Sequence, residues 1–209
     1  MDEGIIRTDA DVAKGAIWLA AREPRFKHAL ALTGPLPLRL RDDGFAALLS
    51  AIVSQQISVA AARGVWAKLE AAGAIEAERI MALDVEALRA LGLSRQKAGY
   101  AKALAEGRLD FAALRRQRAT TVVRELTAIK GIGTWTAEIY AMFSLGRADV
   151  FAAGDLALQE STKVLFGLDA RPKDKELRQI AEAWAPWRAV AARLLWAYYR
   201  VIKDREGIN

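Results

Sequence analysis

The 209-residue chain has the 53% hydrophobic and 27% charged residues typical of a globular protein, and it is long enough for one domain or two packed lobes. It has no cysteine, which excludes disulfides, thiolate nucleophiles and cysteine-bound zinc or iron–sulfur centres, and its single histidine, His28, excludes a multi-histidine metal site and is expected at the surface. A net charge of +6 favours a polyanionic partner such as nucleic acid.

Targeting and membrane signals are not expected. The first residues lack a basic segment followed by an apolar core, so we expect no signal peptide. No apolar run approaches the ~20 residues of a membrane span. The chain is therefore expected to be cytoplasmic.

Helix caps and helical periodicity follow one another along the chain, and no convincing strand or internal repeat interrupts them, so the predicted class is all-α. An extended, proline-containing linker over 33–38 is the clear internal boundary. The predicted helices are 9–22, opened by Thr8 or Asp9; one capped by Asp43 and running through Gln55; one from Ser58 to Gly73; one from Asp84 to Gly92; 95–106, capped by Ser94; one opened by Thr120; one from Asp155 to Phe166, closed by Gly167; one from Asp174 to Ala185; and a last helix with Pro186 at its first position, ending near Lys203.

A glycine hairpin joins two apolar-periodic segments within residues 122–143. Gly131 and Gly133 can adopt φ > 0 and carry no Cβ, so their backbone amides can approach an anion closely. Lys130 lies in the hairpin, and Ile132 between the glycines is expected to be buried and to lock the two helices together. In a basic chain the natural anion is a DNA phosphate; the alternative is a simple turn.

Asp155 follows Gly133 by 22 positions and stands at the start of a predicted helix. Aspartate is a favoured N-cap, and the helix dipole favours a negative charge there. The same position suits a carboxylate that stabilises a developing cation or orients water. Local sequence does not separate the cap from the catalyst, and one residue can serve as both.

Trp196 lies off the apolar stripe of the last helix. That stripe includes Ala191, Leu194, Leu195 and Tyr198, whereas Trp196 projects from the other side, near Arg193 and Arg200. A large aromatic side chain flanked by arginines is either an interface with another lobe or a surface that stacks on a nucleobase.

The turn Ser54-Gln-Gln-Ile-Ser58 joins two apolar helices. Its adjacent amide side chains either cap helix ends or probe base edges and fill a gap in a base stack. Spacing alone leaves both interpretations open.

The hairpin, the segment 149–158, the turn 54–58 and the motif Pro186-Trp-Arg together resemble the helix-hairpin-helix DNA glycosylases, and most of all the 3-methyladenine DNA glycosylase II (AlkA-type) branch. The similarity covers roughly residues 43 to 203 in consistent order. It implies two helical lobes with an active-site cleft between them: a central lobe, 43–150, that includes the hairpin pair 122–143, and a second lobe formed by 1–42 and 151–209.

The resemblance also implies roles for individual residues. Asp155 matches the catalytic aspartate, Trp135 and Trp196 match the aromatic lining of the pocket for the flipped base, and Gln56 matches the wedge inserted into the duplex. The DNA-gripping hairpin corresponds to Lys130, Gly131, Ile132, Gly133 and Thr134. The backbone carbonyls of Thr127, Ile129 and Ile132 match a site for a monovalent cation, Na⁺ or K⁺.

Departures from the family pattern refine the expectation. Trp135 stands where bifunctional relatives carry a lysine nucleophile, so strand cleavage is not expected, and the lack of cysteine excludes the iron–sulfur cluster of some branches. Ala152 replaces a usual proline and Gly154 precedes Asp155, which leaves the shape of that loop open.

The function expected is that of a monofunctional, monomeric DNA glycosylase that flips and excises alkylated bases of the 3-methyladenine and 7-methylguanine type from double-stranded DNA in base excision repair. It would need no cofactor beyond the cation. The alternatives are a glycosylase for oxidised, deaminated or mismatched bases and a non-catalytic helix-hairpin-helix DNA-binding module.

Overall fold

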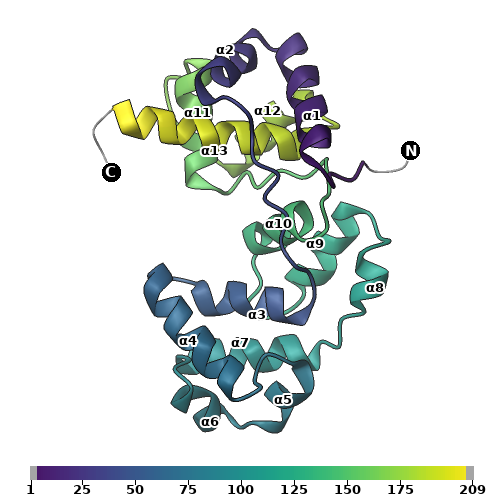
Figure 1. Cartoon of the computed structure of the whole chain (residues 1–209), viewed down its shortest axis with the longest axis vertical. Helices are drawn as coiled ribbons and strands as arrows, with labels where there is room; N and C mark the ends of the chain where they lie inside the picture. The colour runs from purple at the N-terminus through teal and green to yellow at the C-terminus, as the bar shows by residue number, and fades with distance from the viewer. Residues whose placement is uncertain (1–3, 206–209) are drawn as a thin grey trace. The chain divides into compact units, whose positions relative to one another are not determined.

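The computed structural model describes residues 4–205, and within them the regular structure is helical apart from an isolated antiparallel bridge between Ile5 and Arg147 (Figure 1). This confirms the all-α prediction. The chain divides into two compact units, a terminal unit of residues 1–40 and 141–209 and a central unit of residues 41–140. Among the described helices, none is long and apolar enough to cross a membrane.

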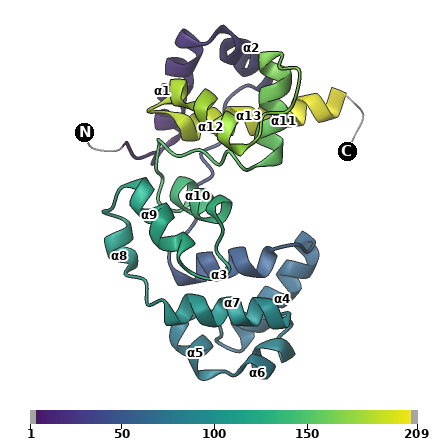
Figure 2. The same ribbon diagram turned by 180° about the vertical axis from the view of Figure 1, so that it is seen from behind.

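The central unit is organised around α7 (Arg95–Glu106), whose buried face carries Ala98, Ala101 and Leu104. Figure 2 shows α7 between α3 on one side and α5 and α6 on the other, and α3 also packs on α4. The remaining helices of this unit are α3 (Phe45–Ser54), α4 (Val59–Ala71), α5 (Ala77–Ala82), α6 (Val85–Ala90), α8 (Phe111–Leu114), α9 (Ala119–Thr127) and most of α10 (Thr134–Phe143).

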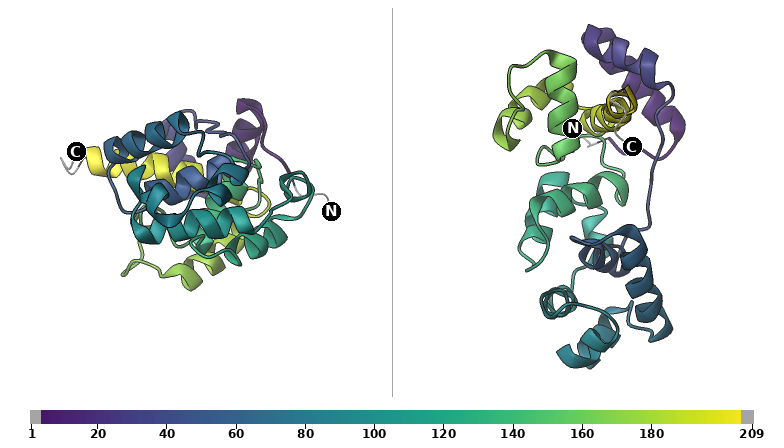
Figure 3. Two further views of the ribbon diagram at one scale, coloured as in Figure 1. Left: turned by 90° about the horizontal axis from the view of Figure 1, so that it is seen from below. Right: turned by 90° about the vertical axis from the view of Figure 1, so that its left-hand side faces the viewer.

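The terminal unit is built on α13 (Arg188–Arg205), which packs against α1, α2 and α11. The right-hand view of Figure 3 shows α13 almost end-on among these helices. Alanines make this close packing possible, since Ala189, Ala191 and Ala192 are fully buried. Around α13 lie α1 (Asp9–Arg22), α2 (Pro24–Thr33), α11 (Leu156–Phe166), α12 (Asp174–Ala181) and a 3₁₀ turn at Glu182–Trp184.

Residues 141–150, expected in the central lobe, belong to the terminal unit. Backbone hydrogen bonds explain the assignment. The Ile6 amide donates to the Gly146 carbonyl (2.7 Å), the Ala148 amide to the Gly4 carbonyl (2.9 Å), and the Ala189 amide to the Ala148 carbonyl (2.9 Å). The segment that leads toward Asp155 is thus fixed to the N-terminal residues and to α13.

Most predicted caps are confirmed because they depend on neighbouring residues. The hydroxyls of Ser58 and Ser94 each accept a hydrogen bond from the backbone amide three residues ahead, both at 3.2 Å, and the Asp84 carboxylate does the same at 2.7 Å. Gly73 and Gly167 adopt the left-handed conformation expected of residues that end helices, with φ near 64° at each.

The predicted cap at Asp43 is wrong. Gly44, with φ 102°, is the N-cap of α3, and its amide donates to the Tyr140 hydroxyl at 2.9 Å. Asp43 instead forms a two-point ion pair with Arg115, 72 residues away, which sequence spacing did not reveal. Burial raises the pKa of Tyr140 to about 12.

The predicted cap at Asp174 is also wrong, because α12 begins at Asp174 itself. Lys173 precedes it as the N-cap and donates its amide to Glu176 (2.9 Å), while Asp174 pairs with Arg178 (2.8 Å).

The predicted helix end at Ala185 and the start at Pro186 both shift. The α-helical part ends at Ala181, and α13 begins only at Arg188. Between them Trp184 is buried, and its ring contacts those of Phe26, Phe151 and Phe166. The buried Trp184 anchors the 3₁₀ turn that separates α12 from α13.

Three helices were not predicted: α2, α5 and α8. In α2 the carboxylate of Glu23 caps the Arg25 amide (3.0 Å), and Pro24 occupies the first helical position rather than ending the preceding helix. Thr120, predicted to open the first hairpin helix, is the second residue of α9. His28 lies exposed on α2, as expected of a surface residue.

Candidate active site

The glycine hairpin joins α9 to α10 in the central unit. Ile132 is 4% exposed, so the prediction that it is buried is confirmed, and its amide donates to the Ile129 carbonyl at 3.1 Å. Gly131 has φ 97°, and a Cβ built there would lie 2.3 Å from Cγ of Tyr100. Only glycine therefore fits this position.

Gly133 is a glycine for a different reason. Its backbone lies outside the left-handed region, and a Cβ added there would meet no atom within 4 Å. Its carbonyl accepts the Ala137 amide (3.0 Å), which makes it the residue that opens α10. The amides of Thr134 and Trp135 therefore lie in the first turn of a helix, where N–H groups lack intrahelical partners and the dipole favours anions. Lys130, Gly133 and Thr134 are all exposed.

The turn after α3 lies against the hairpin. Nε2 of Gln55 donates to the Gly131 carbonyl at 3.0 Å, and Nζ of Lys97 donates to the Val53 carbonyl at 2.7 Å. The next residue, Gln56, is exposed, and its backbone has φ 56°, a conformation that residues other than glycine rarely adopt. Backbone strain of this kind often accompanies a functional position. The structure thus brings the predicted wedge and hairpin residues together within one unit.

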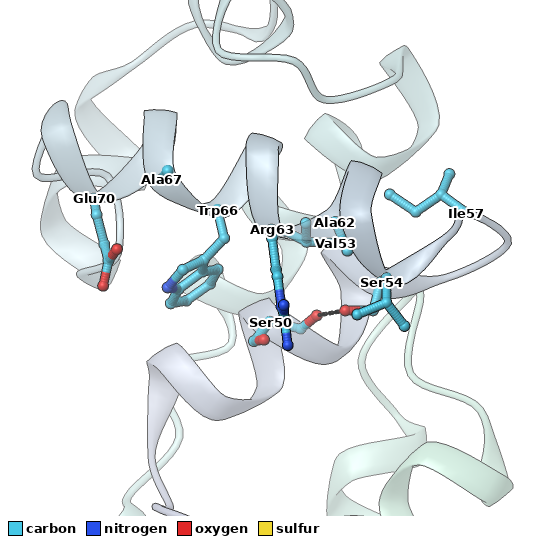
Figure 4. Close-up of a pocket in the computed structure, with 10 residues that line it drawn as sticks. Ser50, Val53, Ser54, Ile57, Ala62, Arg63, Trp66, Ala67 and Glu70 are labelled. Carbon is cyan, nitrogen blue, oxygen red and sulfur yellow. Dashed lines mark hydrogen bonds between the residues drawn. The ribbon is translucent and has the colours of Figure 1, made fainter.

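A cavity of about 320 Å³ lies beside this turn, between α3 and α4 (Figure 4). Trp66 and Arg63 of α4 face Ser50 and Ser54 of α3 across it, and the Ser54 hydroxyl donates to the Ser50 carbonyl at 2.8 Å. No sequence pattern pointed to this cavity, because its walls come from two helices that share no motif.

Asp155 is the N-cap of α11, as predicted, and it is half-buried. Its Oδ1 atom accepts hydrogen bonds from the amides of Ala157 (2.9 Å) and Leu158 (3.1 Å) and from Nε1 of Trp196 (3.2 Å). Two of the predicted site residues are therefore in direct contact, although 41 positions separate them.

The loop before Asp155, whose shape the sequence left open, consists of two tight turns. The Ala153 amide donates to the Phe151 carbonyl (3.0 Å), and the Asp155 amide donates to the Ala152 carbonyl (2.9 Å). The buried side chain of Gln159 donates to the Ala153 carbonyl at 2.9 Å. The loop therefore closes without the proline of the family pattern.

The start of the same loop is held by a two-point ion pair. Nε and Nη2 of Arg188 donate to the two oxygens of Asp149 at 2.6 and 2.9 Å. Arg188 belongs to the Pro186-Trp-Arg motif, so this motif serves to fix the segment that carries Asp155. The sequence contained both motifs but gave no sign that they pair.

Trp196 is half-buried, and its ring lies 5.7 Å from that of Phe143. Arg193, predicted to lie beside Trp196 off the apolar stripe, is buried, with 1% of its surface exposed. Its guanidinium lies 4.7 Å from the centroid of the Phe143 ring and donates to the carbonyls of Leu38 (2.9 Å) and Ala189 (2.9 Å). Burial, and then the charge of Arg39, lower the pKa of Arg193 to about 10.

The other predicted site residues lie in the central unit. Trp135 is 47% exposed, in the first turn of α10. The carbonyl of Thr127 belongs to the last turn of α9, where carbonyls lack partners within the helix, and those of Ile129 and Ile132 follow in the hairpin. Backbone oxygens are the kind of ligand that hard cations take.

Comparisons with known proteins agree with these features. The model of the HhH-GPD superfamily of base excision DNA repair proteins matches residues 49–186. DNA-3-methyladenine glycosylase 1 of Schizosaccharomyces pombe is 30% identical over 197 residues, which cover 88% of this chain and 86% of that protein.

Two solved structures are similar over nearly the whole chain. A DNA-3-methyladenine glycosidase from Bacillus halodurans has a TM-score of 0.82 and 35% identity, covering 98% of this chain and 95% of its own. A 3-methyladenine DNA glycosylase from Schizosaccharomyces pombe, in complex with abasic DNA, has a TM-score of 0.72 and 30% identity, covering 88% of this chain and 95% of its own.

Proposed function

Because the chain belongs to the HhH-GPD superfamily of base excision DNA repair proteins, we propose that it is a DNA glycosylase that hydrolyses the N-glycosidic bond of alkylated bases in base excision repair. The relatives named above as 3-methyladenine glycosylases support this substrate class. The observation that carries the proposal is Asp155, a carboxylate held at a helix N-terminus by two amides and an indole N–H.

The reaction follows from the chemistry of an alkylated base. The target base leaves the duplex stack at a cost of a few kcal/mol, which is smaller for a damaged base. A purine methylated at a ring nitrogen carries a positive charge. When its bond to C1′ breaks, the electron pair stays on the base and neutralises that charge, so little general acid catalysis is needed.

Asp155 acts on the sugar. As the bond breaks, positive charge develops on C1′ and the ring oxygen, and a fixed carboxylate stabilises it electrostatically. The same carboxylate orients a water molecule and accepts a proton as the water oxygen bonds to C1′. The products are the free base and an abasic site.

Trp196 and Trp135 are the proposed aromatic contacts of the flipped base. A cationic, electron-poor ring gains about 0.5–2 kcal/mol per aromatic face through stacking and cation–π attraction. Since Trp135 stands where bifunctional relatives carry a lysine, we also propose that the enzyme lacks strand-cleaving lyase activity.

DNA is proposed to be gripped by the hairpin and opened by the turn. The exposed first-turn amides after Gly133, together with Lys130 and Thr134, would bind a phosphate, and Gln56 would fill the space that the flipped base leaves. The hydrogen bond from Gln55 to the Gly131 carbonyl supports this proposal, because it joins the turn that carries Gln56 to the phosphate-binding hairpin.

A monovalent cation held by the carbonyls of Thr127, Ile129 and Ile132 would add positive charge beside the same phosphate. We further propose that the protein acts as a monomer on chromosomal DNA in the cytoplasm.

The decisive experiment compares base release from a methylated duplex by the wild type, Asp155→Asn and the surface control Asp169→Asn. Asparagine is as good an N-cap as aspartate, so the fold and the DNA affinity should persist. We expect release of 3-methyladenine and 7-methylguanine by the wild type and the control, and loss of release by Asp155→Asn. Binding without release by the wild type would refute the alkylated-base assignment; deaminated and oxidised bases, and then the binding-module alternative, would be tested next.

A further inference from the structure

Three hydrogen bonds converge on one oxygen of Asp155. Three donors, the amides of Ala157 and Leu158 and the indole of Trp196, all reach Oδ1 at 2.9–3.2 Å. A carboxylate oxygen offers about two lone-pair sites, so three donors use the whole accepting capacity of Oδ1. Oδ1 is therefore occupied by the protein itself.

We propose that Trp196 is a positioning residue, whose indole N–H holds the Asp155 carboxylate in the orientation in which it acts on the sugar and the water molecule. The proposal rests on the proposed glycosylase function and assigns Trp196 a role beyond stacking on the base. The two amides belong to α11 itself and are those of an ordinary cap. The indole approaches from α13 and supplies a third, independent anchor that fixes the plane of the carboxylate.

The indole is itself held in place from behind. Its ring lies 5.7 Å from the Phe143 ring with 34° between their planes, and the Arg193 guanidinium lies 4.7 Å from the centroid of that ring. Arg193 is anchored by the carbonyls of Leu38 and Ala189 and is 1% exposed. Phe143 thus contacts both Arg193 and Trp196, and the Trp196 indole donates to Oδ1 of Asp155.

These contacts give a buried arginine a function. Arg193 donates to two carbonyls, so its removal would leave buried acceptors unsatisfied. Here its removal would also loosen Phe143 and, through it, the indole that holds the carboxylate. A stacking surface needs only ring area, whereas a positioning residue needs the N–H at one edge of the ring.

The test separates ring area from the N–H group. In Trp196→3-benzothienylalanine a sulfur atom replaces the N–H while the bicyclic ring is retained, and Trp196→Phe removes both the N–H and part of the ring. We expect the benzothienyl variant to release 7-methylguanine about ten- to hundred-fold more slowly in single turnover, because a charge-assisted hydrogen bond is lost. Its affinity for abasic-site DNA should stay within about twofold of the wild type.

A matched control is the same replacement at the half-buried Trp66 of α4, which should leave the rate unchanged. The indole N–H resonance of Trp196 should also shift in Asp155→Ala and disappear in the benzothienyl variant. A benzothienyl variant as fast as the wild type would overturn the positioning role and leave stacking as the function of Trp196. Failure of the proposed function looks different, because the wild type itself would then release no base.

Discussion

The two hairpin glycines offer a sharp test, because the structure requires them for different reasons. In Gly131→Ala, the left-handed backbone costs about 1–2 kcal/mol. Forcing a methyl group to within 2.3 Å of the Tyr100 ring adds about 1–3 kcal/mol. The free energy of unfolding should therefore fall by roughly 2–5 kcal/mol, which for a chain of this length lowers the melting temperature by roughly 4–20 °C.

Gly133→Ala should behave in the opposite way. The added methyl group meets no protein atom within 4 Å, so stability should stay within about 0.5 kcal/mol of the wild type. It would, however, keep a phosphate away from the first-turn amides of α10. We expect about tenfold weaker binding of duplex DNA, equivalent to about 1.4 kcal/mol.

Thermal melting and fluorescence anisotropy on the same samples measure both effects, at one fixed salt concentration because affinity for DNA depends on salt. Gly99→Ala is the matched control, because Gly99 is exposed on α7 and a Cβ added there would meet no atom within 4 Å. This variant should gain about 0.5–1 kcal/mol of stability without changing DNA binding. Wild-type affinity in Gly133→Ala would refute phosphate binding by these amides. Wild-type melting in Gly131→Ala would refute the contact with Tyr100.

Three further outcomes are expected. Gln56→Gly relieves the left-handed backbone strain, so stability should stay within about 1 kcal/mol of the wild type, yet base release should slow at least tenfold. Fluorescence of 2-aminopurine in the duplex would report the loss of base flipping. Unchanged flipping would exclude a wedge role for Gln56. Arg188→Met removes the partly exposed ion pair with Asp149, so the substitution should cost about 1 kcal/mol of stability. It should also slow base release several-fold at unchanged DNA affinity. Single-turnover kinetics that match the wild type would show that this ion pair does not affect the site. Burial raises the pKa of the Tyr140 hydroxyl to about 12, so its contribution to stability is complete below pH 10 and is lost as pH rises toward 12. In denaturant titrations the stability advantage of the wild type over Tyr140→Phe should therefore shrink across that window. A constant difference would contradict the pKa shift.

The sequence predicted those features whose causes lie within a few residues. Ser58, Ser94 and Asp155 cap helices by reaching amides two or three positions ahead, so each cap is visible in a short window of sequence. The hairpin and its buried Ile132 were predicted for the same reason, since two glycines between apolar-periodic segments leave few alternatives.

Features that depend on distant partners were missed. Arg193 lies off the apolar stripe of its helix, and the sequence gave no sign that its guanidinium donates to the Leu38 carbonyl, 155 positions away. Asp43 was expected to cap a helix but pairs with Arg115. Nothing in either local sequence indicates such a partner. An aspartate before a helix matches the N-cap pattern whether or not its carboxylate caps that helix.

The dual position of Asp155 has a consequence for how this protein could lose its activity over time. A substitution at 155 that removes the N-cap also weakens the start of α11, so most changes there would be purged for instability before their effect on activity mattered. Asparagine, serine, threonine and glycine are the replacements that keep a favourable N-cap while removing the carboxylate. A descendant that has become an inactive DNA-binding protein should therefore carry one of these four residues at the position, and that single residue would distinguish it from a working enzyme of the same fold.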